Sequence, residues 1–261
     1  SKKILIADIL GQTSSSIFYS MDMGMDAGTA WIALICYTFS LYMDFSGYSD
    51  MAIGMAAMFG FDFKENFNFP YLSTSVTEFW RRWHISLGAW FREYLYFPLG
   101  GSRKGNVYLN LFIVFLATGI WHGAAWVYLF WGAMHGACVA AERYMMRKGW
   151  YEKIPAALRW AATFFIVSIG WITFNVTTFE EFTEFLGYLF GKGTPISFTW
   201  LFYLTPRLVT LWIVVIFGSL LFSRKKVQVR LAKWNEESRI FNGIKYLLLL
   251  SLIHISEPTR H

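Results

Sequence analysis

Three of the five histidines lie near the middle of the chain, in short motifs whose residue types suit acyl-transfer chemistry. His84 ends Arg-Arg-Trp-His, His122 lies in Gly-Ile-Trp-His-Gly, and His135 lies in Met-His-Gly. An imidazole takes a proton from an alcohol or thiol near neutral pH and returns it to a leaving group. Apolar and small residues flank His122 throughout Val107 to Ala141. Because a polar group within a bilayer is costly unless it faces a cavity or a partner, His122 is the first candidate for a catalytic base.

Each histidine also has a structural interpretation. His122 is equally suited to hydrogen-bond a neighbouring helix. Spacing alone favours His84 as a solvated or headgroup-contacting residue, because basic and aromatic residues surround it. For His135, a packing or hydrogen-bonding role is the simpler prediction.

Other polar residues offer weaker chemistry. The segment Asp44-Phe-Ser-Gly-Tyr-Ser-Asp50 places two carboxylates and three hydroxyls between apolar runs, but no GxSxG or SxxK pattern marks a nucleophilic serine. We expect it to be a polar helix break that caps the next helix. Cys36 and Cys138 lie in apolar segments without CxxC spacing, and no HExxH occurs, so the sequence indicates no metal site.

Composition determines the class of protein that must position these residues. Hydrophobic residues make up 56% of the chain and charged residues only 15%, against about 25% charged in a typical soluble domain. Several apolar runs approach the roughly 20 residues that span a bilayer as a helix. The runs are Ala27 to Met43, Val107 to Ala141, Ala156 to Phe174, Phe198 to Phe222 and Gly243 to Ile255. We predict an all-α, polytopic transmembrane bundle.

The pattern also predicts individual elements. A helix from Ala27 should stop at Asp44, and a shorter Gly- and Ala-rich helix, Tyr48 to Phe61, should be buried among others. Asp62 to Arg103 mixes aromatic and basic residues, which is typical of interfacial or re-entrant helices. Val107 to Ala141 is too long for one straight crossing, so it should bend at its glycines.

Charge gives a topology and excludes one class of partner. The net charge of +6 comes from Lys and Arg in short loops between apolar runs, which argues against nucleic-acid binding. Glu142 to Arg159 and Ser223 to Arg239 are basic and should be cytoplasmic, whereas Asn175 to Ser197 is acidic and should face outward. Ala156 to Phe174 and Phe198 to Phe222 are then opposite crossings.

We see no internal repeat, so residues 1–261 are expected to form a single membrane domain. The chain lacks an initiator Met and is expected to be incomplete at its N-terminus. Residues 256–261 are interpreted as a truncated or non-native tail.

A series of motifs resembles a known family. They are Tyr42-Met-Asp-Phe-Ser-Gly-Tyr-Ser-Asp-Met-Ala-Ile-Gly, Glu65-Asn-Phe-Asn-Phe-Pro-Tyr, Thr77-Glu-Phe-Trp-Arg-Arg-Trp-His-Ile-Ser-Leu, Tyr94-Leu-Tyr-Phe-Pro-Leu-Gly-Gly and Gly119-Ile-Trp-His-Gly. Together, from about Lys2 to Tyr144, they resemble the membrane-bound O-acyltransferases, and within them the bacterial branch acting on alginate and teichoic acid. The likeness is to the C-terminal part of such proteins.

The resemblance implies roles for particular residues. His122 matches the family's catalytic histidine near the membrane centre, and His84 matches a second functional position that is asparagine in many eukaryotic relatives. As substrate-binding residues we expect Asp44, Tyr48, Trp83 and Trp121.

The resemblance also implies a function. The protein would be an acyltransferase of the inner membrane, crossing it several times and contacting its lipid, that transfers groups other than aminoacyl groups. It would move an acetyl group from a cytoplasmic thioester, acetyl-CoA or an acyl carrier protein, for O-acetylation of a polysaccharide such as alginate. An extracytoplasmic acetyltransferase partner would complete the transfer, and no cofactor would be bound.

Two other functions remain open on the residues alone. A transporter or channel would bind a substrate at midplane without covalent change, but the paired broken helices in two related halves that typify one are not seen. A scaffold would only anchor a soluble acetyltransferase, and its activity would survive loss of His122.

Overall fold

The computed structural model describes residues 2–193 and 199–237, and within these ranges every regular element is a helix. This confirms the all-α class for the described part, while the tail at 256–261 and the run from Gly243 lie outside it. The elements are η1 Lys3–Ala7, α1 Asp8–Tyr19, η2 Met21–Met23, α2 Ala27–Met58, η3 Pro70–Leu72, α3 Val76–Arg82, α4 Ile85–Phe91, η4 Arg92–Tyr96, α5 Val107–His122, α6 Trp126–Arg147, η5 Tyr151–Lys153, α7 Ala156–Ile172, α8 Phe179–Leu189, α9 Trp200–Tyr203, α10 Pro206–Phe222 and α11 Lys225–Glu237.

The predicted helix break at Asp44 is wrong, because α2 runs without interruption from Ala27 to Met58. The carboxylates within it pair with the start of the chain: Lys3 bonds Asp44, and Lys2 Nζ lies 2.7 Å from Asp50 Oδ2. A Cβ on Gly47 would lie 3.3 Å from Lys2 Cβ, so η1 packs closely on this turn. The polar run stays helical because Lys2 and Lys3 at the start of the chain, distant in sequence, neutralise it.

The second half of α2 also differs from the expectation of burial. Tyr48, Met55 and Met58 are each more than half exposed, and no atom lies within 4 Å of a Cβ built on Gly54. Gly54 therefore does not mark a helix contact among the described residues.

Val107 to Ala141 does bend, as predicted. The helix α5 ends at His122, Gly123 takes the positive φ of 156°, and α6 begins at Trp126. A Cβ on Gly119 would lie 2.4 Å from Tyr128 O, and one on Gly132 would lie 2.4 Å from Phe115 O. Glycine is therefore required twice where the two helices touch, since any side chain there would push them apart.

The later apolar runs form helices with one additional break. Ala156–Ile172 forms α7, but the run from Phe198 is divided into α9 and α10, with Thr205 capping α10 and Pro206 in its first turn. Among the described residues, no helix by itself has both the length and the apolar character needed to cross a membrane. Together, α10 and the first part of α11 reach that length and apolar character, but the two are bent by 89° relative to each other. The apolar helices α5 and α7 are shorter.

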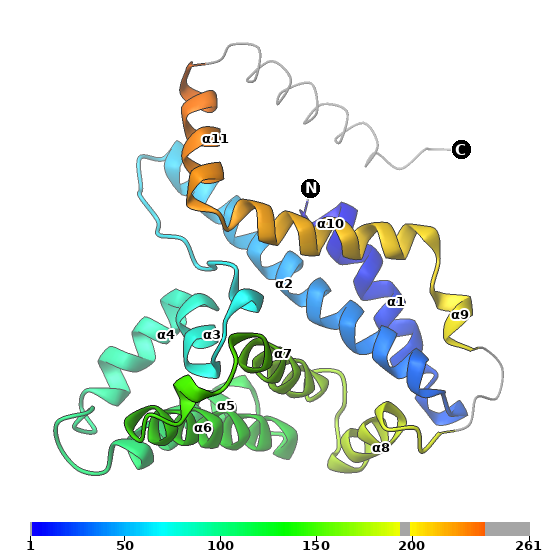
Figure 1. Ribbon diagram of the computed structural model, residues 1–261, viewed down its shortest axis with the longest axis horizontal. Coiled ribbons are helices and arrows are strands. Elements are labelled where there is room, and N and C mark those ends of the chain that lie inside the picture. Colours follow the sequence, from blue (N-terminus) through cyan, green and yellow to red (C-terminus); the bar gives the residue numbers. More distant parts are fainter. Residues whose placement is uncertain (1, 194–198, 238–261) are drawn as a thin grey trace.

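The core that positions the site is aromatic and lies where α3, α6 and α7 meet. Figure 1 shows α3 and α4 on the same side of the molecule as the α5–α6 pair, with α7 beside them and α2 running alongside α1 on the other side of α7. Phe79, Trp131 and Trp171 are almost fully buried at this junction. Trp171 Nε1 donates to Tyr71 Oη at 3.1 Å, and Tyr71 Oη donates to Thr38 O at 2.7 Å, which ties α7 to α2.

Candidate active site

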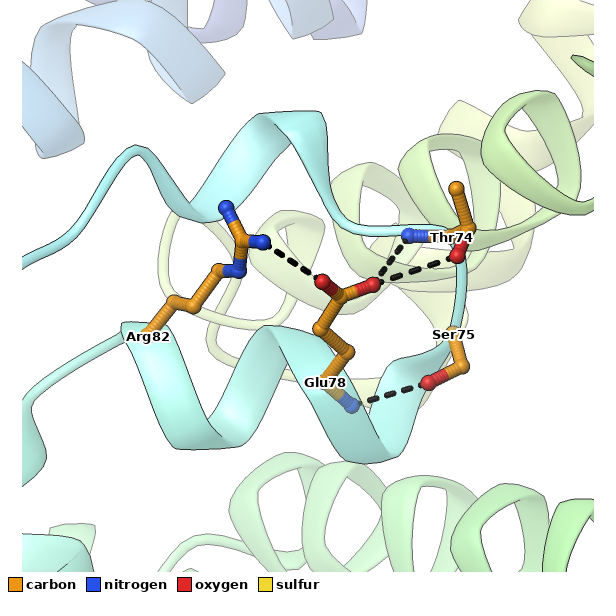
Figure 2. Close-up of polar contacts among 4 residues, drawn as sticks. All are labelled: Thr74, Ser75, Glu78 and Arg82. Carbon is orange, nitrogen blue, oxygen red and sulfur yellow. Dashed lines mark hydrogen bonds and ion pairs between the residues drawn. The ribbon is translucent and has the colours of Figure 1, made fainter. Parts of the chain in front are cut away.

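The site begins at α3, whose first turn is held by a local capping arrangement. Ser75 Oγ accepts from Glu78 N at 2.9 Å, while the Glu78 carboxylate accepts from Thr74 N at 2.8 Å and from Arg82 Nη2 at 2.6 Å (Figure 2). This is a variant of the capping box. Burial raises the pKa of Glu78, but the Thr74 hydrogen bonds and the charge of Arg82 outweigh burial and leave the pKa below its usual 4.5. The carboxylate is therefore ionised at neutral pH and stabilises the turn.

His84 follows α3 in an unusual backbone conformation. Its φ of 45° and ψ of 56° lie in the left-handed region, which among side-chain-bearing residues favours Asn, Asp and His. The turn is held by Asn66, whose carbonyl O accepts from Ile85 N at 3.0 Å and whose Oδ1 accepts from Ser86 N at 3.0 Å. The local fold thus fixes the direction of the His84 ring.

The ring of His84 is oriented and partly desolvated. Its Nδ1 lies 3.3 Å from Asn66 Oδ1, so the tautomer that donates from Nδ1 leaves the Nε2 lone pair available. Phe45 meets the ring edge-on at 4.8 Å between centroids. Burial, and secondly repulsion from His122 when that ring is protonated, lower the pKa of His84 to about 4. His84 is consequently neutral at physiological pH.

His122 is the last residue of α5, immediately before the Gly123 turn, and is half-buried. Trp131 and Phe174 meet its ring edge-on, each at a centroid distance of 5.1 Å, and Trp121 lies at 4.9 Å. Among the residues that the structure describes, none hydrogen-bonds the ring, so apolar packing alone orients it. A histidine held in this way keeps both nitrogens for a substrate.

A run of aromatic rings connects the two histidines. Phe67 lies near His84, with 6.4 Å between centroids, and meets Trp83 edge-on at 5.0 Å. Trp83 contacts Trp171 at 5.0 Å, Trp171 stacks on Trp131 at 6.3 Å, and Trp131 contacts His122. The fold therefore gathers two histidines that are distant in the sequence around one cluster.

His135 joins the same cluster as a buried residue. It is fully buried in α6, and Trp80 Nε1 donates to its Nδ1 at 3.3 Å. The predicted packing and hydrogen-bonding role is confirmed.

A cavity of about 410 Å³ opens beside His84, between α3–η4 and the α5–α6 pair. Its wall is mostly apolar, but Arg81, Arg92 and Arg143 also line it. Neither His122 nor Trp121 is among its lining residues; Trp80 lines it and contacts Trp131, which in turn contacts His122. The remaining lining residues include Thr77, Trp83, Leu87, Phe91, Tyr96, Leu111, Val114, Phe115, Thr118, Val139 and Met146.

The expected substrate-binding residues are not gathered in one place. Trp83 is buried in the aromatic cluster and lines the cavity, and Trp121 is 58% exposed beside His122. Asp44 is paired with Lys3, and Tyr48 is largely exposed, on the same stretch of α2. Of the four, Trp83 and Trp121 lie next to the candidate histidines.

Three residues near the site had no functional role predicted from the sequence. Glu142 and Arg143 were counted only as charges of a basic loop, although both belong to α6 and face α3 or the cavity. Asn66 was quoted within a motif without a role. A charged residue within the last turns of an apolar helix was the available signal for Glu142. In the described part of the chain, no three His, Cys, Asp or Glu residues gather as a metal site would require.

Comparison with known proteins places this architecture in a family. The model of the membrane-bound O-acyltransferase family matches residues 2–180. The probable alginate O-acetylase of Pseudomonas putida is 46% identical over 194 residues, which cover 74% of this chain and 39% of that protein. The peptidoglycan O-acetyltransferase of Helicobacter pylori is 39% identical over 73% of this chain and 37% of its own length.

A relative of lower identity is named for a different activity. The teichoic acid D-alanyltransferase of Bacillus subtilis is 31% identical over 61% of this chain and 40% of that protein. The chain thus spans about two fifths of the length of the curated relatives it matches. By the extent of the family match and the identity to these relatives, the chain belongs to the membrane-bound O-acyltransferase family.

Proposed function

We propose that the protein is a membrane O-acyltransferase that uses His122 and His84 to pass an acetyl group from a cytoplasmic thioester toward a polysaccharide such as alginate. The observation that carries the proposal is the gathering of His84 and His122 around one aromatic cluster, next to a cavity lined by arginines. The names of the relatives, an alginate O-acetylase and a peptidoglycan O-acetyltransferase, support O-acetylation of a glycan.

The cavity suits a thioester donor. An acetyl-CoA or acyl carrier protein arm carries phosphate together with a long, weakly polar chain, and the cavity combines Arg81, Arg92 and Arg143 with apolar walls. The arm would lie along α3 with its thioester directed toward the cluster that holds the two histidines. The donor is a substrate, and the proposal requires no bound cofactor.

The chemistry follows from the two imidazoles. His122 takes the proton of an acceptor hydroxyl as that oxygen attacks the thioester carbonyl; the C–O bond forms, the C–S bond breaks and the proton passes to the departing sulfur. A transient acyl-imidazole on His122 is the alternative route. Because Nδ1 of His84 faces Asn66, its Nε2 lone pair can accept from a second hydroxyl of the acceptor sugar, next to the one that reacts, which favours an orienting role over oxyanion stabilisation.

An extracytoplasmic acetyltransferase that completes the transfer, and an inner-membrane location with several crossings, belong to the same proposal. The membrane location draws support from the family match and from the apolar composition.

The test compares glycan O-acetyl content in cells that produce the protein unmodified or with His122→Ala or His122→Gln, at membrane levels matched by immunoblot. We expect ester content to fall by about 100-fold or more in both, as for loss of a general base. Tyr19→Ala, which truncates a side chain that is 94% exposed, serves as the control and should retain activity. Unchanged ester content in both His122 variants would favour the scaffold or transporter instead.

A further inference from the structure

The helix α3 is too short to keep its conformation and position without contacts to other helices. It has seven residues, and isolated helices of fewer than about 12 residues are marginal in water. Yet Thr77, Trp80 and Arg81 on it line the cavity, and His84 follows it directly. The geometry of the proposed site therefore depends on what fixes α3 to the rest of the molecule.

Glu142 of α6 makes the first attachment. The side chain is 6% exposed, and its carboxylate accepts from Val76 N at 2.6 Å, Thr77 N at 2.9 Å and Thr77 Oγ1 at 2.8 Å. These are N–H groups of the first turn, which have no partner within α3. A carboxylate is also favoured there by the helix dipole. The carboxylate of Glu142, which belongs to a different helix and is distant in sequence, thus caps α3.

His135 makes the second attachment, two turns earlier on α6. Its Nδ1 accepts from Trp80 Nε1, which places the proton of the neutral ring on Nε2. That nitrogen faces α7, where a Cβ on Gly170 would lie 2.7 Å from it. The ring is therefore held between α3 and α7 with no room to turn.

Both residues lie on one face of α6. His135, Val139 and Glu142 are spaced i, i+4 and i+7, which aligns them along a helix, and Val139 lines the cavity between the two polar contacts. We infer that His135 and Glu142 form a clamp, named here the α6 clamp, that sets the register of α3 so that His84 and the cavity wall stay aligned with His122. Both are positioning residues, and this role rests on the proposed function.

The test separates a role of His135 and Glu142 in positioning α3 from a role in the stability of the whole fold. Glu142→Leu and His135→Leu remove the two acceptors at similar side-chain volume. Glu142→Gln keeps one acceptor oxygen, and His135→Asn supplies an amide oxygen as acceptor in place of Nδ1. Amide hydrogen exchange of residues 74–84 in the purified protein should rise about tenfold or more in the Leu variants and less in the Gln and Asn variants. Glu180→Gln, in the exposed first turn of α8, is the matched control and should leave this exchange unchanged.

Kinetics then show whether the clamp serves the site. With acetyl-CoA as donor, kcat/KM should fall about 10- to 100-fold in the Leu variants, mainly through a higher KM, because α3 forms the cavity wall while His122 stands on α5. The Asn and Gln variants should recover much of this loss. His122→Ala should instead lower kcat rather than raise KM, and it should leave amide hydrogen exchange at residues 74–84 unchanged.

Two results would contradict the proposal that the α6 clamp positions α3 for the site. One is unchanged exchange at residues 74–84 in both Leu variants. The other is raised exchange with an unaltered KM and kcat/KM, which would make the contacts merely structural. If His122→Ala keeps full activity, the proposed function fails instead, and the exchange data still decide whether His135 and Glu142 hold α3.

Discussion

At the scale of single residues, backbone conformation restricts which side chains the site accepts. His84 and Phe69 are the two residues other than glycine with positive φ in the described part of the chain; Phe69 follows Asn66 by three residues, and His84 lies beside the Asn66 side chain. Asn adopts the left-handed conformation more readily than most residues, whereas β-branched residues rarely do. Asparagine is therefore the substitution at position 84 that changes the chemistry while disturbing the backbone least.

That substitution gives a pH prediction. The pKa of His84 is about 4 in the folded protein because of burial and repulsion from His122 when that ring is protonated, against about 6.5 when exposed. As the pH falls from 6.5 toward 4, the unfolded chain binds a proton that the folded chain refuses, so the free energy of unfolding decreases; above pH 6.5 there is no such effect. The thermal midpoint in detergent should fall more between pH 7.5 and 5 for the unmodified protein than for His84→Asn.

Because the other titrating groups are common to both proteins, the difference between their two pH slopes reports the titration of His84 together with its coupling to His122. Parallel slopes would mean that His84 is solvated and charged at pH 5, contrary to the arrangement described above.

At the scale of elements, the α5–α6 pair is the part that depends most on close helix contact. Gly119 and Gly132 lie where each helix meets the backbone of the other, and His122 is one turn beyond Gly119. Any change that separates these helices therefore also moves His122 relative to Trp131.

Gly119→Ala should destabilise the protein by about 1–3 kcal/mol, as overpacking does, since its Cβ would lie 2.4 Å from Tyr128 O. Gly54→Ala in α2 is the matched control, because its Cβ meets no atom within 4 Å and removing a mid-helix glycine stabilises by about 0.5–1 kcal/mol. Thermal midpoints of the two variants should shift in opposite directions. A rise in both would show that α5 and α6 do not touch at Gly119.

At the scale of the whole molecule, charge should decide orientation in the membrane. The basic segments after α6 and α10 were predicted to be cytoplasmic, and the acidic segment around α8 to face outward. Figure 1 shows α8 and α11 at opposite ends of the molecule, an arrangement compatible with this prediction.

Single cysteines at exposed positions test it, in a variant with Cys36→Ala and Cys138→Ala. A membrane-impermeant maleimide added to intact cells should label Glu180→Cys and leave Lys148→Cys and Lys226→Cys unlabelled until the cells are permeabilised. Labelling of either lysine position in intact cells would reverse or refute the topology.

The sequence by itself determined the helical class, the presence of a bend at a glycine within Val107 to Ala141 and the identity of the candidate histidines. These follow from apolar content, from glycine and from motif residues, which are local properties of the chain. It also indicated a helix break at Asp44 that does not exist, because the lysines that neutralise Asp44 and Asp50 stand at the start of the chain, distant in sequence.

Only the tertiary structure decided how the site is assembled. That His84 and His122 share an aromatic cluster, that Glu142 caps α3 and that His135 accepts from Trp80 are all contacts between residues far apart in the chain. Residue type and periodicity report which face of a helix is apolar but not which other helix it meets. A buried carboxylate near the end of an apolar helix therefore reads as part of a charged loop until its partner, the first turn of α3, is seen beside it.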